Sequence, residues 1–171
     1  MFCKGQITGQ INKMGSDDKG LGRWCYVQLS RKYNKHIWVI ATYRVCKQGN
    51  GGSETAYMQQ VRILSRQENI KPDPWTQWTK DLLQFVKTIP KGDEILVIGD
   101  MNGDLEDQEL STFLAEAELY DLVTATHTES TPPTYIRGNK TIDHMFGTMG
   151  ILNAVERVGM VEFQSRRRRR F

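Results

Sequence analysis

The sequence has few of the features that mark secreted or membrane-bound proteins. Its three cysteines, Cys3, Cys25 and Cys46, are odd in number and widely spaced, which predicts free thiols and neither a disulfide framework nor a metal-binding pair. No apolar run approaches the roughly 18 residues that a membrane span needs. The first residues also lack the apolar stretch of a signal peptide. We therefore expect an intracellular protein that does not enter a membrane.

An internal repeat and a low-complexity linker are also missing. With 171 residues, 39% hydrophobic and 25% charged, the chain is typical of one globular domain with a sizeable core. The formal net charge of +3 arises at one end, because the five arginines of 166–170 contribute +5 and all other residues together −2. Such a run contacts phosphates or directs nuclear import, and a solvated terminus is the alternative. This divides the chain into a domain at 1–163 and a basic tail at 164–171.

Hydrophobic periodicity predicts alternating strands and helices. Two apolar runs flank a polar turn at 33–35, which indicates a hairpin. Asp73 is a natural helix N-cap, and Pro74 suits the first helical position. The expected strands are 24–29, 36–43, 94–99 and 141–146, the expected helices span about 55–66, 74–89 and 110–117, and a last segment covers 155–163. One mixed α/β domain follows from this order.

Asp100 and Asn102 come directly after the apolar run 94–99. In open α/β sheets, ligands bind at the carboxyl ends of the strands. A carboxylate there acts as a base or metal ligand, and an amide holds a water or a phosphoryl oxygen. Ordinary turn chemistry is the alternative, since both residues favour turns. A calcium loop is excluded, because Leu105 and Ser111 stand where an EF-hand needs Gly and Glu.

Two further side chains belong with this pair. Tyr43 lies at the end of the expected strand 36–43, and Asp143 lies on the expected strand 141–146. Carboxylates, an amide and a phenol at strand ends together indicate phosphodiester cleavage.

Read in order, four segments carry a family resemblance. They are Ala-Thr-Tyr-Arg at 41–44, Val-Ile-Gly-Asp-Met-Asn at 97–102, Thr-Tyr at 134–135 and Ile-Asp-His-Met-Phe at 142–146. The set resembles the endonuclease/exonuclease/phosphatase superfamily, and the context at 22–24 and 42–46 looks closest to retroelement-type endonuclease domains. The resemblance implies the α/β (α+β) class and a four-layer α/β sandwich of the deoxyribonuclease-I-like type, with two mixed sheets between helices, present here as an incomplete fragment.

The resemblance also implies roles for individual residues. Asp100 would act as the general base or position the attacking water, and would also bind a metal, Mg²⁺ or Mn²⁺. Asn102 would hold that water or a phosphate oxygen, and Tyr43 would donate a hydrogen bond to the phosphate. Asp143 would orient a catalytic histidine. The residues implied for the substrate groove are Thr134, Tyr135 and Asn139.

The chain departs from the family pattern at both ends. The family takes an Asn and a metal-binding Glu from strands that precede the region present here, and it closes with Ser-Asp-His. Here 164–171 contains neither Asp nor His. His144 does not replace that histidine, because neighbours on a strand face opposite ways and Asp143 faces the site. We therefore expect weak or no catalysis by this chain alone, and exposed sheet edges that favour aggregation.

Three functions remain open at this point. The first is a metal-dependent nucleic-acid endonuclease, with DNA preferred over RNA as partner, in the nucleus or as part of a larger polyprotein. The second is a phosphatase of the same superfamily. The third is a non-catalytic remnant that binds nucleic acid through the arginine tail.

Overall fold

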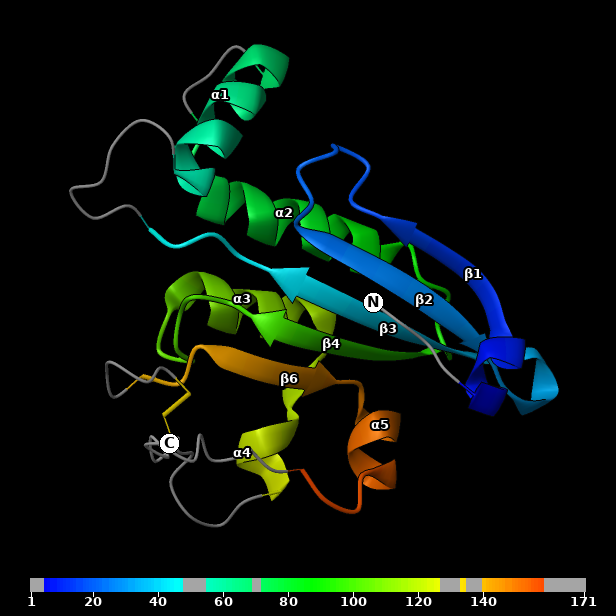
Figure 1. The fold of residues 1–171 in the computed structure, drawn as a ribbon. Helices are drawn as coiled ribbons and strands as arrows, with labels where there is room; N and C mark the ends of the chain where they lie inside the picture. Colours follow the sequence, from blue (N-terminus) through cyan, green and yellow to red (C-terminus); the bar gives the residue numbers. More distant parts are fainter. Residues whose placement is uncertain (1–4, 48–54, 69–71, 127–132, 135–139, 159–171) are drawn as a thin grey trace, which may run out of the picture.

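The computed structural model describes residues 5–47, 55–68, 72–126, 133–134 and 140–158. They form a six-stranded mixed sheet with the strand order β1-β2-β3-β4-β6-β5 (Figure 1). The strands are β1 Ile11–Ser16, β2 Trp24–Ser30, β3 His36–Tyr43, β4 Glu94–Asp100, β5 Tyr120–Asp121 and β6 Asp143–Gly147. The β3–β4 pair is parallel, and the other described pairs are antiparallel.

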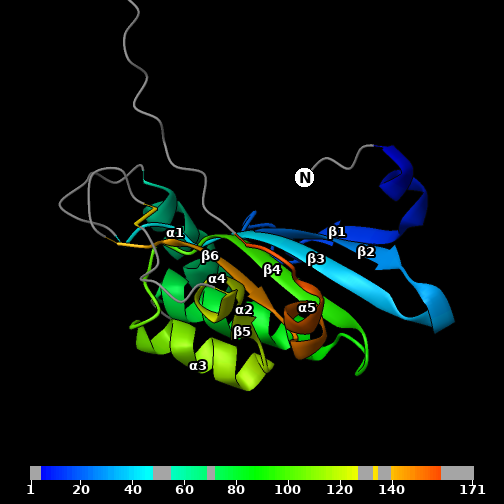
Figure 2. The same ribbon diagram turned by 90° about the horizontal axis from the view of Figure 1, so that it is seen from below.

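Helices cover one face of this sheet, and two short helices lie near its β6 side. The helices are α1 Ala56–Glu68, α2 Pro74–Lys87, α3 Gln108–Ala117, α4 Leu122–Thr126 and α5 Met149–Ala154, with 3-10 turns at Gly5–Gln10 and Lys32–Asn34. Figure 2 shows α2 and α3 together beneath the sheet, whereas α4 and α5 lie near β6. None of the described helices is long and apolar enough to cross a membrane.

Local sequence signals explain where α2 begins and which face it buries. The Asp73 carboxylate accepts a hydrogen bond from the Trp75 backbone at 3.3 Å, and Pro74 occupies the first turn. The buried side chains of Trp78, Leu82 and Val86 then recur every four residues, which places them on one helical face. The predicted start and apolar face of this helix are confirmed.

The core row of the sheet crosses four strands. Tyr26, Ile40, Val97 and Phe146 are successive register partners on β2, β3, β4 and β6. All four are at most 9% exposed and belong to the core that includes α2 and α3. Because side chains alternate along a strand, residues an odd number of positions away lie on the opposite face.

The predicted α/β class and hairpin are confirmed, and some elements differ from expectation. The hairpin is formed by β2 and β3. The last predicted strand begins two residues later, at Asp143. β1, α4 and α5 have no predicted counterpart, and the described part of 155–163, which ends at Val158, contains no helix or strand. The described residues provide one sheet of the expected sandwich with its helical layer.

Gly99 on β4 is required by the close approach of β3. A Cβ atom at this position would lie 1.8 Å from the backbone oxygen of Thr42. We expect Gly99→Ala to lower the free energy of unfolding by about 1–3 kcal/mol, because the two strands would have to separate. Thermal unfolding measures this, with Gly9→Ala as the control, since a Cβ at Gly9 meets nothing within 4 Å. Equal loss of stability in both variants would contradict the steric argument.

Candidate active site

Three of the predicted residues form a second row across the sheet. Tyr43 on β3 is the register partner of Asp100 on β4, and Asp100 is the register partner of Asp143 on β6. This Tyr43–Asp100–Asp143 row lies three positions from the core row, so its side chains project from the face opposite α2 and α3. It stands where β3 and β4 end and β6 begins (Figure 1).

Asp100 and Asp143 face each other as a close cross-strand pair. The Asp100 backbone oxygen accepts from the Arg44 N–H at 2.9 Å, and the Asp143 N–H donates to Thr134 Oγ1 at 3.0 Å. Both backbones therefore bond outward, as in a non-hydrogen-bonded antiparallel pair, where side chains approach most closely. Cβ atoms in such pairs are about 4.5–5.5 Å apart, and like charges there are destabilising.

The electrostatics of the pair follow from this placement. Burial raises the pKa of the Asp100 carboxyl, and the negative charge of Asp143 raises it further. The Asn102 N–H and His144 oppose these effects without cancelling them. Within the described parts of the chain, no lysine or arginine forms an ion pair with either carboxylate. A carboxylate with a perturbed pKa, such as Asp100, is typical of functional sites.

Asn102 lies beside this pair in a tight turn. Its backbone is left-handed, with φ of 48°, a conformation that asparagine tolerates better than most residues. The backbone N–H donates to Asp100 Oδ1 at 2.9 Å, and the side-chain Nδ2 donates to the Arg44 oxygen at 2.5 Å. The amide oxygen accepts from Cys46 Sγ at 2.9 Å. The turn thus fixes the Asn102 side chain next to Asp100.

Tyr43 presents its hydroxyl to the same place. Its side chain is 42% exposed. Burial of the remainder raises the pKa of the phenol, the neighbouring Cys46 and Asp100 raise it further, and Asn102 lowers it in part. Since the ordinary value is 10.0, the hydroxyl keeps its proton at neutral pH and can donate it in a hydrogen bond.

Arg44 holds this end of the sheet together, a role that the sequence does not reveal. The side chain is 0% exposed and lies over the Trp75 ring, with 3.7 Å between the guanidinium carbon and the ring centroid. Its Nε donates to the Met101 oxygen at 2.6 Å, and a terminal nitrogen donates to Asp107 at 3.2 Å. Arg44 therefore fixes the backbone that carries Asp100 and Asn102.

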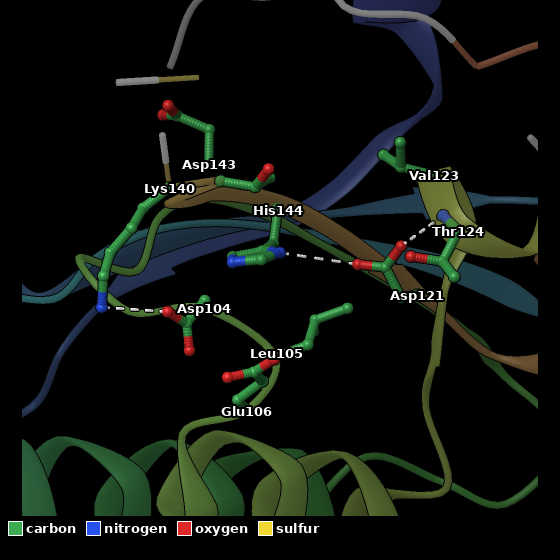
Figure 3. A pocket seen from close by; sticks show the side chains of 10 residues that line it. Asp104, Leu105, Glu106, Asp121, Val123, Thr124, Lys140, Asp143 and His144 are labelled. Carbon is green, nitrogen blue, oxygen red and sulfur yellow. Dashed lines mark hydrogen bonds and ion pairs between the residues drawn. The ribbon is translucent and has the colours of Figure 1, made fainter. Parts of the chain in front are cut away.

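His144 lies on the opposite face from the row, as predicted. It is 5% exposed, and its Nε2 is 2.8 Å from the Gly103 oxygen. Its Nδ1 is 3.5 Å from an Asp121 carboxylate oxygen. Figure 3 shows Asp143 pointing away from both His144 and Asp121. His144 therefore supports the loop after Asn102 from beneath the sheet and does not reach the row.

Asp121 is a second residue whose role the sequence does not reveal. Burial alone raises the pKa of its carboxyl, but hydrogen bonds from His144 and from Thr124 outweigh burial and lower it. Asp121 and His144 line a cavity of about 450 Å³ together with Asp143 and Lys140 (Figure 3). The cavity lies beside β5, β6 and the adjoining loops, and Asp143 is the residue of the row that borders it.

Of the three residues predicted to line the substrate groove, the structure describes only Thr134. Thr134 Oγ1 accepts from the N–H groups of Ile142 and Asp143, at 2.9 and 3.0 Å. Its oxygen thus orders the start of β6. Tyr135 and Asn139 lie outside the described residues, and their contact with substrate stays a prediction.

Asp100 and Asp143 fit a magnesium ion better than a caged metal centre. Among the described residues, no group of three or more His, Cys, Asp or Glu side chains comes together as a metal site. Mg²⁺ usually keeps several waters and is held by one or two carboxylates plus substrate phosphates. The two facing carboxylates, one with a raised pKa, provide that donor set and gain from a cation between them.

Comparison with known proteins identifies the fold. No protein-family model matches the sequence, and no curated protein does either. Among solved structures, the chain is similar to the human Nocturnin catalytic domain with bound sulfate, at 15% identity and a TM-score of 0.51, over 75% of this chain and 42% of that one. It is also similar to a humanized D. rerio TDP2, at 12% identity and a TM-score of 0.51, over 81% and 52% of the two chains.

A third similar structure contains magnesium. It is a mutant beta toxin from Staphylococcus aureus with bound magnesium ions, at 20% identity and a TM-score of 0.47, over 75% of this chain and 43% of that one. The chain spans about half the length of the solved chains it matches. It has the deoxyribonuclease-I-like fold, which confirms the predicted resemblance at the level of fold.

Proposed function

We propose that the Tyr43–Asp100–Asp143 row, with Asn102, is a metal-dependent site for phosphodiester hydrolysis in nucleic acid. The observation that carries this proposal is the register itself, which brings a phenol and two carboxylates to one strand end on one face. Like charges that face each other across a strand pair are destabilising, and such arrangements are typical of functional sites.

Each side chain has a task that suits its surroundings. Asp100, whose pKa is raised by burial and by Asp143, accepts a proton from the attacking water or orients that water. Tyr43 and the amide of Asn102 donate hydrogen bonds to the phosphoryl oxygens, where negative charge develops. Mg²⁺ or Mn²⁺, held by Asp100 and Asp143, would supply charge stabilisation at the phosphoryl group.

A further role for Asp143 is proposed beside the histidine-orienting one that the resemblance implies. A carboxylate that orients a catalytic histidine needs that histidine on its own face. Among the described residues, His144 lies on the other face, and His36 has the same parity along β3 as the core residue Ile40. We therefore propose that Asp143 also serves as a metal ligand.

Nucleic acid is the proposed partner, with DNA before RNA. The context at 22–24 and 42–46 supports this through its resemblance to retroelement-type endonucleases, and the five-arginine run supplies phosphate-binding charge. The similar Nocturnin structure contains a bound sulfate, an anion shaped like phosphate, which is consistent with a phosphate-binding role for this fold. A nuclear location and a place within a larger polyprotein belong to the same proposal.

The test measures metal binding before turnover. Titration with Mn²⁺, followed by electron paramagnetic resonance, is expected to show binding that Asp143→Asn weakens at least tenfold. Supercoiled plasmid is expected to be nicked slowly with Mg²⁺ and not at all with EDTA. Glu116→Gln, which alters an exposed carboxylate on α3, should match the wild type in both assays. Mn²⁺ binding that is indifferent to Asp143→Asn, or nicking that persists in EDTA, would refute the proposal.

A further inference from the structure

Cys46 lies at the edge of the proposed site, on a segment whose backbone is fixed. β3 ends at Tyr43, and the next two residues are buried, with Arg44 0% and Val45 3% exposed. The Val45 oxygen accepts from the Trp75 indole at 2.6 Å. Cys46 then returns to the surface as an exposed free thiol. Its Cα position is therefore set by the core, although its side chain faces solvent.

The thiol and the Arg44 carbonyl together favour one orientation of the Asn102 amide. Asn102 Nδ2 donates to the Arg44 oxygen at 2.5 Å, and Asn102 Oδ1 accepts from Cys46 Sγ at 2.9 Å. If the amide turned over, its oxygen would face the Arg44 carbonyl and its NH₂ group would face the thiol proton. The contact with the Arg44 carbonyl would then be repulsive, and at Cys46 a good acceptor of the thiol proton would be exchanged for a donor that finds only the weakly accepting sulfur. The Cys46 donor and the Arg44 acceptor thus favour one orientation of the Asn102 amide. In this orientation the second N–H and the second oxygen lone pair of the amide stay available for a ligand.

Cys46 also lies near the other proposed phosphate donor. Cys46 and Asn102 both stand close enough to the Tyr43 phenol to influence its pKa. Tyr43, Cys46 and Asn102 therefore lie together beside Asp100, with the thiol next to both proposed phosphate donors.

We propose that Cys46 is a positioning residue of this site, whose thiol helps to orient the Asn102 amide toward the phosphoryl group. The proposal rests on the function proposed above. It deepens that function, because it assigns a task to a residue that itself touches neither metal nor reacting atoms. The thiol is needed as a hydrogen-bond donor, which serine can replace and alanine cannot.

The first experiment follows the Asn102 side-chain amide directly by nuclear magnetic resonance. In ¹⁵N-labelled full chain, the Asn102 side-chain NH₂ signal is identified by its loss in Asn102→Asp. We expect Cys46→Ala to shift this signal and to speed its hydrogen exchange at least tenfold, and Cys46→Ser to restore most of the protection. Cys25→Ala, which removes a half-buried thiol on β2, should leave the signal unchanged. An unchanged Asn102 signal in Cys46→Ala would overturn the proposal.

The second experiment separates this inference from the proposed function. In plasmid nicking, Cys46→Ala is expected to lower kcat by roughly 10–100-fold through misorientation, with KM and Mn²⁺ affinity unchanged, and Cys46→Ser is expected to recover most of the rate. If the wild type nicks DNA and Cys46→Ala nicks equally well, the inference fails and the function stands. If the wild type neither binds Mn²⁺ nor nicks, the function fails, and the Asn102 signal alone decides whether Cys46 orients the amide.

Discussion

Asp100→Asn is expected to stabilise the fold at pH 7 and to reduce nicking to background. The variant removes one of two facing negative charges, and a like-charged cross-strand pair costs about 0.2–1 kcal/mol. For a protein of this size, that corresponds to a rise of roughly 1–3 °C in Tm. Catalysis should fall by about 10²–10⁴-fold, the usual contribution of a well-placed general base. Asn keeps the oxygen that accepts from the Asn102 backbone, so the turn should survive.

The pH dependence of the stability effect has a definite sign. The pKa of Asp100 in the folded protein lies above its ordinary value of 3.8, so the folded state binds the proton more tightly than the unfolded state. The stability that this carboxyl contributes is complete below the unfolded pKa and is lost as the pH rises through the folded pKa. The Tm advantage of Asp100→Asn should therefore be greatest near neutral pH, shrink as the pH falls through the folded pKa, and be absent below the ordinary value of 3.8.

Asp143→Asn provides the matched control for this charge pair. Either single substitution removes the repulsion, so the double variant should be less stabilised than the sum of the two single variants. Differential scanning calorimetry at about pH 7 and about pH 3.5, on either side of the titration of this carboxyl, measures all four proteins. A lower Tm for Asp100→Asn at pH 7, or strict additivity, would mean that the two carboxylates do not repel each other in the folded chain.

Local signals predicted the elements that position the site. Asp73 and Pro74 mark the start of α2 because capping depends on neighbours in the sequence. The apolar run before Asp100 predicts β4 for a similar reason, since a buried strand needs apolar side chains. β1 was missed, because its sequence Ile-Asn-Lys-Met-Gly-Ser does not alternate and most of its side chains are exposed. Pairing with β2 makes it a strand, and pairing is not a local property.

The supporting residues of the site could not be predicted in this way. Arg44 and Met101 are 57 positions apart, and Cys46 and Asn102 are 56 apart. Their contacts exist because β3 and β4 pair in parallel with one particular register, and a shift by one residue would turn every side chain to the other face. Strand ends identify candidate catalytic residues from the sequence, whereas the residues that orient them emerge only after the strands are paired.

Arg44→Met is expected to destabilise the fold severely, because it removes a buried positive charge together with its hydrogen bonds. It removes the donor to the Met101 oxygen and leaves the Asp107 carboxylate, 3.2 Å from the guanidinium, without this cation. Breaking one side of a buried charge pair costs about 3–5 kcal/mol. Because Asp107 also caps α3 through two backbone N–H groups, we expect about 3 kcal/mol, near the lower limit of that range. The corresponding fall in Tm is roughly 6–12 °C.

Arg44→Lys should not restore the stability lost in Arg44→Met. Because lysine keeps the positive charge, this result would show that the shape of the guanidinium is required as well as its charge. Arg44 uses a planar fork against two acceptors while stacked on Trp75, and lysine provides neither the fork nor the stacking. The matched control is Lys87→Met, which breaks an exposed ion pair with Glu116 and should cost less than about 1 kcal/mol. Equal melting temperatures for Arg44→Met and Lys87→Met would refute the role of Arg44. If the role is correct, Mn²⁺ affinity should fall together with Tm in the Arg44 variants, because the backbone that carries Asp100 is held by this buried cation.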